Sequence, residues 1–152
     1  MKGKAAETVE TENVTTAYAI LRNPDTIFLI ETDTDIQEDT TLLQRSREVS
    51  AHLLHFKVKT LRRGVVDLPD LPAEEWLTST DTLAGAPGHY LTLEANAQIG
   101  SPRSPYLMLN FQTGITNMAL DTPPKSSSLS NNEVVSLWDA VTRTLRPRPN
   151  GF

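Results

Sequence analysis

The nine residues LTLEANAQI (91–99) alternate apolar and polar side chains without a break. This period of two is typical of a β-strand with one buried and one solvent-facing side. After the loop GSPRSP (100–105), the alternation returns in YLMLNFQ (106–112), where Leu107, Leu109 and Phe111 share the buried side. The two segments therefore predict an antiparallel hairpin with one buried side.

Further extended segments are expected on both sides of this hairpin. Residues 14–30 predict a second hairpin, because Asn23-Pro24-Asp25 supplies turn residues between two apolar runs. Residues 57–66 are expected to be extended and 115–120 to form another strand, whereas 73–77 favour a short helical turn and 79–88 a loop. The run Leu68-Pro69-Asp70-Leu71-Pro72 breaks regular structure, since proline lacks the N–H that a ladder or helix needs.

Two amphipathic helices are predicted at about 40–56 and 131–145. The first has a cap at Asp39 or Thr40 and an apolar stripe formed by Leu42, Val49, Leu53 and Phe56, with Ser46 between them. The second has a capping box made by Ser130 and Glu133 and an apolar stripe formed by Val134, Trp138, Val141 and Leu145. We therefore predict an α+β fold, in which a mainly antiparallel sheet built from hairpins carries both helices on one face.

The length of 152 residues is typical of one domain. Residues 1–12 are polar and predict an N-terminal arm, residues 13–146 form the predicted domain, and residues 147–152 form a Pro/Arg tail. Hydrophobic residues make up 38% of the chain and charged residues 22%, a balance typical of a folded domain and not of a disordered chain.

Charge and cysteine content restrict the classes of partner. A net charge of −5 disfavours binding to nucleic acid or an acidic membrane, and no apolar run is long enough to span a bilayer. The N-terminus lacks the apolar segment of a secretory signal. The absence of cysteine excludes disulfides and thiolate metal sites and fits a reducing compartment. We therefore expect a cytoplasmic protein that does not bind membranes.

Motifs for catalysis, metals and cofactors are weak or missing. The glycines do not form a nucleotide-binding pattern, and no serine lies in a nucleophile-elbow context. His52, His55 and Glu48 lack the spacing of a helical zinc motif and are read as surface residues. The sequence therefore predicts no catalytic residues, no metal and no cofactor, and favours a protein that is not an enzyme.

The remaining hypothesis is a protein-binding or assembly subunit of a homo-oligomer or larger complex. In the tail, Arg146 and Arg148 offer guanidinium groups and Phe152 a terminal aromatic ring, and the two prolines favour an extended course. The acidic run containing Glu31, Asp33 and Asp35 of a neighbouring subunit is the expected acceptor.

Two alternatives remain open. A single-stranded nucleic-acid-binding protein would combine the tyrosines of the sheet with a basic segment. Its candidate contacts are Lys57, Lys59, Arg62, Arg63 and Arg103, with Tyr18, Tyr90 and Tyr106 as stacking platforms. A small enzyme with no recognisable motif is the second alternative.

Overall fold

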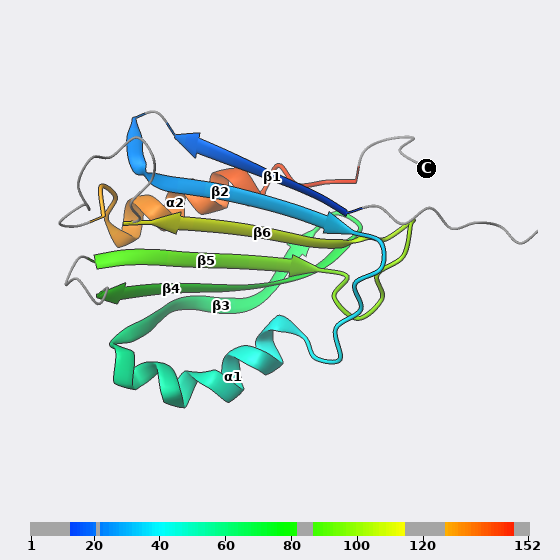
Figure 1. Cartoon of the computed structure of the whole chain (residues 1–152), viewed down its shortest axis with the longest axis horizontal. Helices are drawn as coiled ribbons and strands as arrows, with labels where there is room; N and C mark the ends of the chain where they lie inside the picture. Colours follow the sequence, from blue (N-terminus) through cyan, green and yellow to red (C-terminus); the bar gives the residue numbers. More distant parts are fainter. Residues whose placement is uncertain (1–12, 21, 82–86, 115–126, 148–152) are drawn as a thin grey trace, which may run out of the picture.

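A six-stranded antiparallel sheet organises the chain (Figure 1). The computed structural model describes residues 13–20, 22–81, 87–114 and 127–147. The strands lie in the order β1-β2-β6-β5-β4-β3. Their bounds are β1 (Asn13–Ile20), β2 (Asn23–Asp33), β3 (Val58–Leu68), β4 (Leu71–Asp81), β5 (Pro87–Ala95) and β6 (Tyr106–Thr113).

Two α-helices complete the α+β fold that the sequence predicts. α1 spans Leu42–Leu53 and continues into a 3-10 turn, η1, at Leu54–Phe56, and α2 spans Asn131–Thr142. The capping box of Ser130 and Glu133 is confirmed, whereas α1 is capped by Thr41 and not by Asp39 or Thr40. Neither described helix combines the length and apolar character needed to cross a bilayer.

One part of the predicted fold is wrong, because the two helices lie on opposite faces of the sheet. The Leu43 N–H of α1 donates to Glu74 (2.9 Å), whereas the Trp138 indole of α2 donates to Glu75 (2.9 Å). Successive strand residues point to opposite faces of a sheet. Because Glu74 and Glu75 are neighbours on β4, α1 and α2 must lie on opposite faces. In Figure 1, α2 lies behind the sheet, and α1 lies beside β3 and β4.

The apolar core lies between the sheet and α2. Trp138 and Val134 are fully buried there, and Phe28 stacks on Phe111 with ring centroids 4.1 Å apart. The strands contribute the buried side chains Leu68, Ala73, Leu77, Leu91, Leu93, Ala95 and Leu109. Because β5 and β6 supply these residues at every second position, the alternation in the sequence correctly identifies the core side.

The predicted solvent-facing side of 91–99 is in fact covered. Thr92, Glu94 and Asn96 are 7%, 8% and 5% exposed, whereas Ile99, which the alternation placed inside, is 56% exposed. α1 contacts β3 and β4 on this side, and its Arg45 pairs with Glu94. The sequence therefore identifies the strand but not the second layer that lies on it.

The segment between β3 and β5 differs most from the prediction. Residues 73–77, expected as a helical turn, belong to β4, and much of the expected loop 79–88 belongs to β4 and β5. The predicted break at 68–72 is narrower than expected. Only Pro69 and Asp70, whose φ is 57°, form the turn between β3 and β4, whereas Pro72 pairs with Asp67 inside the sheet. The strand expected at 115–120 lies outside the described residues.

Candidate partner-binding surface

Exposed apolar side chains gather around α1. Eight large hydrophobic residues are exposed in the described part of the chain, and three of them, Val14, Tyr18 and Tyr90, lie on β1 or β5. The other five lie along α1 and η1 or beside the first turn of α1, and we call them the α1 flank: Val49, Leu54, Phe56, Val65 and Ile99. Apolar residues grouped in this way are typical of an interaction surface.

The first part of the α1 flank lies where α1 ends. Leu54 is 74% exposed and Phe56 is 63% exposed. Lys57 follows with a left-handed φ of 56°, and its N–H donates to the Leu54 carbonyl (3.2 Å), so the chain turns into β3. Burying a Leu or Phe side chain stabilises a protein by about 1.5–3 kcal/mol. Folding of the chain alone does not bury these two side chains, so this stabilisation is available to a partner that covers them.

A groove lies next to this exposed turn, between α1 and the edge of the sheet. Its volume is about 470 Å³, and α1, η1, β3 and β4 contribute Leu53, Leu54, Val58 and Trp76 to its walls. The Trp76 indole donates to the hydroxyl of Thr60 (3.0 Å), which fixes the orientation of the ring. An apolar side chain of a partner that contacts Leu54 would therefore find a preformed apolar wall.

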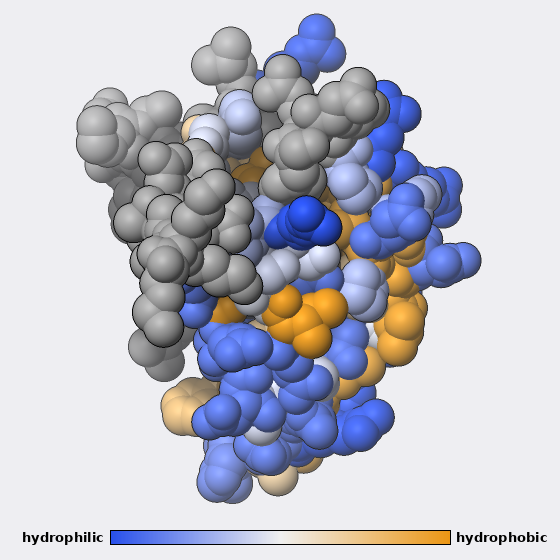
Figure 2. Space-filling model, turned by 90° about the vertical axis from the view of Figure 1, so that its right-hand side faces the viewer, coloured by the Kyte–Doolittle hydropathy of each residue, from blue (hydrophilic) through white to orange (hydrophobic). Residues whose placement is uncertain are grey.

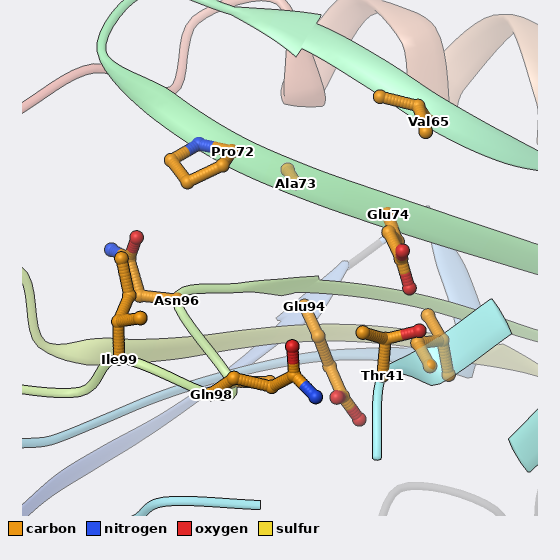
Figure 3. Close-up of a pocket in the computed structure, with 11 residues that line it drawn as sticks. Thr41, Val65, Pro72, Ala73, Glu74, Glu94, Asn96, Gln98 and Ile99 are labelled. Carbon is orange, nitrogen blue, oxygen red and sulfur yellow. The ribbon is translucent and has the colours of Figure 1, made fainter. Parts of the chain in front are cut away.

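The second part of the α1 flank borders a cleft where α1 begins (Figure 3). The cleft has a volume of about 340 Å³. Val65, 77% exposed, comes from β3, and Ile99, 56% exposed, comes from the loop after β5. Thr41, Leu42, Pro72, Ala73, Glu74, Glu94, Asn96, Ala97 and Gln98 complete the lining.

Two loops hold the Ile99 side of this cleft in place. The Glu38 N–H donates to the Ala97 carbonyl (2.6 Å), and the Gln98 side chain donates to the Asp39 carbonyl (3.2 Å). Gly100 approaches the Ile36 carbonyl so closely that a Cβ would lie 2.3 Å from the oxygen. Figure 2 views the end of the molecule that carries these loops, where apolar groups lie among hydrophilic ones. The connection after β5 thus contributes a wall of the cleft.

Acidic groups dominate the polar lining of the cleft. Glu74 accepts the Leu43 N–H at the start of α1 (2.9 Å), and Glu94 pairs with Arg45, whose Nη1 also donates to the Thr40 carbonyl (2.6 Å). Burial lowers the pKa of Arg45, but the hydrogen bond and charge of Glu94 outweigh this, so the pKa is raised. The lining of the cleft therefore contains two carboxylates, and the permanently charged guanidinium that pairs with Glu94 belongs to a residue outside the lining.

Asn96 lies in the wall of the same cleft and carries an unused acceptor. Its Nδ2 donates to the Pro105 carbonyl (3.1 Å), whereas its buried Oδ1 has no hydrogen-bond partner among the described residues. Figure 3 shows this amide beneath Pro72. The φ of Asn96 is 58°, a left-handed conformation that asparagine tolerates better than most residues. Leaving a buried oxygen without a hydrogen bond costs free energy of folding, so a donor that reached this oxygen would be stabilised.

On the other face, Arg62 joins the sheet to α2. Its guanidinium donates to Glu75 Oε1 (2.6 Å) and pairs with Asp139, while the Trp138 indole donates to Glu75 Oε2 (2.9 Å). Hydrogen bonds to Asp139 and then to Glu75 raise the pKa of Arg62 above its ordinary value. Arg62 therefore has a structural role in holding α2 on the sheet.

This ion pair makes stability depend on pH. Hydrogen bonds from Arg62 outweigh burial and hold the pKa of Asp139 below its ordinary value of 3.8. A carboxylate whose pKa is lower in the folded than in the unfolded state stabilises the fold at pH values above the unfolded-state pKa. This stabilisation is lost as the pH falls through the folded-state pKa.

We expect Asp139→Asn to lower the free energy of unfolding by about 1–2 kcal/mol at pH 7. The difference from the wild type should shrink as the pH falls through the folded-state pKa of Asp139. Urea unfolding from about pH 2 to pH 7, with Asp67→Asn as control, measures this. An equal loss at both ends of the range would contradict it.

The structure describes only some of the residues predicted to form the contact between the tail and the acidic run. Asp33 caps the turn after β2, because its carboxylate accepts N–H groups of Asp35 (2.7 Å) and Ile36 (3.1 Å). Glu31 is half-buried and Asp35 is exposed. Arg146 is exposed and lines a cavity of about 340 Å³ with Arg103 and Thr32 of β2. Arg148 and Phe152 lie outside the described residues, and the proposed contact between subunits stays a prediction.

The residues of the predicted nucleic-acid surface do not share one face. Arg62 and Arg63 point to opposite faces of β3: Arg62 pairs with Asp139 of α2, and Arg63 donates to Ser50 of α1 (3.1 Å). Lys57, which follows η1, and Lys59 of β3 are exposed, and Arg103 is exposed in the loop between β5 and β6.

The three tyrosines are also separated. Tyr106 is buried, with 6% of its surface exposed. Burial raises the pKa of the Tyr106 hydroxyl, and the negative charge of Glu94 raises it further. Tyr18 is opposite Phe28 on the α2 face, and Tyr90 is opposite Thr78 on the other face. These basic residues and tyrosines do not form one continuous surface. The nucleic-acid alternative stays a prediction.

Sequence reasoning did not identify the α1 flank. The helical spacing assigned Val49 and Phe56 to the buried stripe, but both are exposed, while Leu42 and Ser46 are buried. The alternation assigned Ile99 to the buried side, which is wrong because Ile99 is 56% exposed, and Val65 carried no signal that separates a core residue from an exposed one. Phe56 continues the helical spacing without a break, so the 3-10 turn at Leu54–Phe56 that exposes it is visible only in the structure.

Comparison with known proteins gives a family and a fold. A family model described as "Tle cognate immunity protein 4 C-terminal domain" matches residues 2–150. No curated protein matches the sequence.

Three solved structures share the fold. The immunity protein TplEi of the T6SS from Pseudomonas aeruginosa, complexed with "L" peptide, has a TM-score of 0.78 and 24% identity over 96% of this chain and 51% of that one. The Tle4-Tli4 complex gives 0.77 and 24% over 95% and 48%. PA94 from Pseudomonas aeruginosa, a protein of unknown function, gives 0.53 and 14% over 96% and 90%. This chain thus spans about half the length of the first two.

Proposed function

The chain belongs to the Tle cognate immunity protein 4 C-terminal domain family, and from this premise we propose that it binds a cognate Tle effector protein without catalysing a reaction. The family match over residues 2–150 is the observation that carries the proposal. A structure with the same fold is that of the Tle4-Tli4 complex. Family membership supports the protein-binding, non-catalytic part, and the identity of the effector is the finer part of the proposal.

We propose the α1 flank as the binding surface. It combines an exposed aromatic, Phe56, and an exposed Leu54 with a groove at one end of α1 and a cleft at the other. Stable interfaces bury about 800 Å² on each partner and depend on a few apolar or aromatic anchors that enter pockets. The length of α1 separates the two hollows, so one partner surface lying along the helix could use both.

Titration calorimetry with the purified cognate Tle effector tests the proposal. We expect saturable 1:1 binding of the 152-residue chain with a dissociation constant in the micromolar range or below. The heat-capacity change should be negative, because apolar side chains of the α1 flank leave water. A Tle effector of a different family serves as the control partner. No measurable heat with the cognate effector at about 100 μM protein, and no co-sedimentation at that concentration, would contradict the proposal.

Self-association is a second proposal, supported by the outer edge of β1. The two sheet edges differ: β3 carries Lys59, Arg62 and Arg63 and adjoins α1, whereas β1 has no charged residue and no proline. Uncharged edge strands readily pair with another strand. A second copy running antiparallel about Thr16 would place only uncharged residues opposite one another. The predicted homo-oligomer and cytoplasmic location stay predictions.

Ala17→Lys tests pairing through β1. Ala17 is exposed, and a lysine at a sheet edge opposes pairing through its charge and its hydration. We expect sedimentation equilibrium to show wild-type dimers at high protein concentration and at least tenfold weaker dimerisation of the variant. Ser136→Lys, on the exposed side of α2, adds the same charge elsewhere and should leave dimerisation unchanged. A wild-type chain that is monomeric at every concentration would exclude this mode.

A further inference from the structure

We propose that the cleft at the start of α1 binds an arginine side chain of the protein partner. The inference rests on the proposed function for the existence of that partner, but it concerns one subsite and one chemical group. Its basis is the chemistry of the cleft lining, in which hydrogen-bond acceptors and negative charge exceed donors and positive charge.

The charge of the cleft favours a cation. Glu74 and Glu94 both line it, and Arg45 pairs with Glu94, so one negative charge remains uncompensated within the lining. One oxygen of Glu74 accepts the Leu43 N–H, and its other oxygen has no hydrogen-bond partner among the described residues. A cation bound in a partly enclosed site is attracted more strongly than at an open surface. An anionic group would be repelled.

Asn96 provides an independent observation. Its side chain is about nine-tenths or more buried, since the residue is 5% exposed, and its Oδ1 lacks a hydrogen bond within the described part of the chain. The other end of the amide donates to the Pro105 carbonyl, which orients the oxygen away from that carbonyl. Native structures leave few buried polar atoms unpaired, and such an atom in a cleft wall suits a donor-bearing ligand.

The apolar rim distinguishes arginine from a small cation. Val65 and Ile99 lie on opposite sides of the opening, and Pro72 and Ala97 add apolar surface. Arginine has an apolar stem that packs on such side chains, and a planar head with five N–H donors that bonds several acceptors at once. A volume of about 340 Å³ is at the small end for ligand sites and suits one long side chain. A metal ion fits less well, because Arg45 already pairs with Glu94.

Glu74→Gln tests the subsite in the complex with the cognate effector. Glutamine retains a carbonyl oxygen that accepts the Leu43 N–H, so α1 keeps its contact while the charge is removed. We expect at least tenfold weaker binding and a smaller dependence of affinity on salt. Glu133→Gln makes the same chemical change at the start of α2, on the other face of the sheet, where the glutamine oxygen can still accept the Ser130 N–H, and it should change affinity less than twofold. Equal affinities of the wild type and Glu74→Gln would overturn the inference while leaving the proposed function intact.

A small probe tests the subsite without the effector. Acetyl-arginine amide and its uncharged isostere acetyl-citrulline amide are titrated to about 50 mM into isotope-labelled chain while NMR spectra are recorded. We expect the arginine probe to shift the signals of the Asn96 side-chain amide and of Ile99, and citrulline to shift neither. The same titration with Glu74→Gln should show no shift. If the arginine probe leaves these signals in place, or citrulline moves them equally, the cleft does not recognise arginine.

Discussion

Trp138→Ala is expected to lower the free energy of unfolding by about 3–5 kcal/mol, the range for removing a large buried aromatic side chain. Trp138 is fully buried between α2 and the sheet, and its indole donates to Glu75, a carboxylate that is only 6% exposed. The substitution would leave a cavity and remove one donor from a buried charged group. Because a domain of this size is stabilised by only about 5–15 kcal/mol, the loss is a large part of the total.

Urea unfolding at pH 7, followed by circular dichroism, measures this effect. Ser136→Ala, on the exposed side of α2, should change stability by less than about 0.5 kcal/mol. Trp138→Phe keeps most of the apolar volume but loses the donor to Glu75, and it should lie between the two. A loss below about 1 kcal/mol for Trp138→Ala would show that α2 does not depend on this contact.

The double variant Leu54→Asp/Phe56→Asp is expected to bind the cognate effector at least a hundredfold more weakly than the wild type. Both side chains are already largely in water, so the folded chain should lose little stability. An interface that covers them would instead bury two carboxylates, each without a compensating cation. Loss of one central anchor typically costs at least about 2 kcal/mol of binding free energy, and two proposed anchors in the same turn are affected here.

Calorimetry of the variant with the effector gives the affinity, and a thermal melt confirms that the fold is retained. Tyr18→Asp is the matched control, since Tyr18 is an exposed aromatic on β1 at the opposite edge of the sheet. It should bind within about threefold of the wild type. If Tyr18→Asp abolishes binding and Leu54→Asp/Phe56→Asp does not, the interface lies on the β1 side.

The sequence predicts those elements whose signals are local. Period-two alternation identifies β5 and β6 because both strands present one side to the same core. Asn23-Pro24-Asp25 predicts the hairpin of the first two strands but not its turn, because these three residues already belong to β2 and Asn23 pairs with Ile20. The box of Ser130 and Glu133 identifies the start of α2, because capping depends only on residues within one turn.

Other features depend on contacts between distant segments. Ala73-Glu74-Glu75-Trp76-Leu77 has no apolar alternation, yet it forms β4 because β3 and β5 pair with it on both sides. Such pairing overrides the helix preference of alanine, glutamate and leucine. The face on which a helix packs is equally non-local: Glu74 and Glu75 are neighbours in sequence, but one contacts α1 and the other α2.

The candidate surface was the least predictable part. The helical pattern assigns Phe56 to the apolar stripe whether or not its side chain is buried. In the structure the chain turns away at Lys57, and Phe56 is left exposed. The cleft at the other end of α1 combines residues from β3, β4, the α1 cap and the loop after β5. Spacing along the chain cannot indicate that these segments meet.

Hydrogen–deuterium exchange of the chain, with and without the cognate Tle effector, tests most directly whether the α1 flank is the binding surface. We expect the effector to slow exchange in α1, in the turn at Leu54–Phe56 and in the loop that carries Ile99, while α2 and the outer edge of β1 stay unchanged. Slower exchange confined to α2 or β1, with α1 and the Ile99 loop unaffected, would contradict the account.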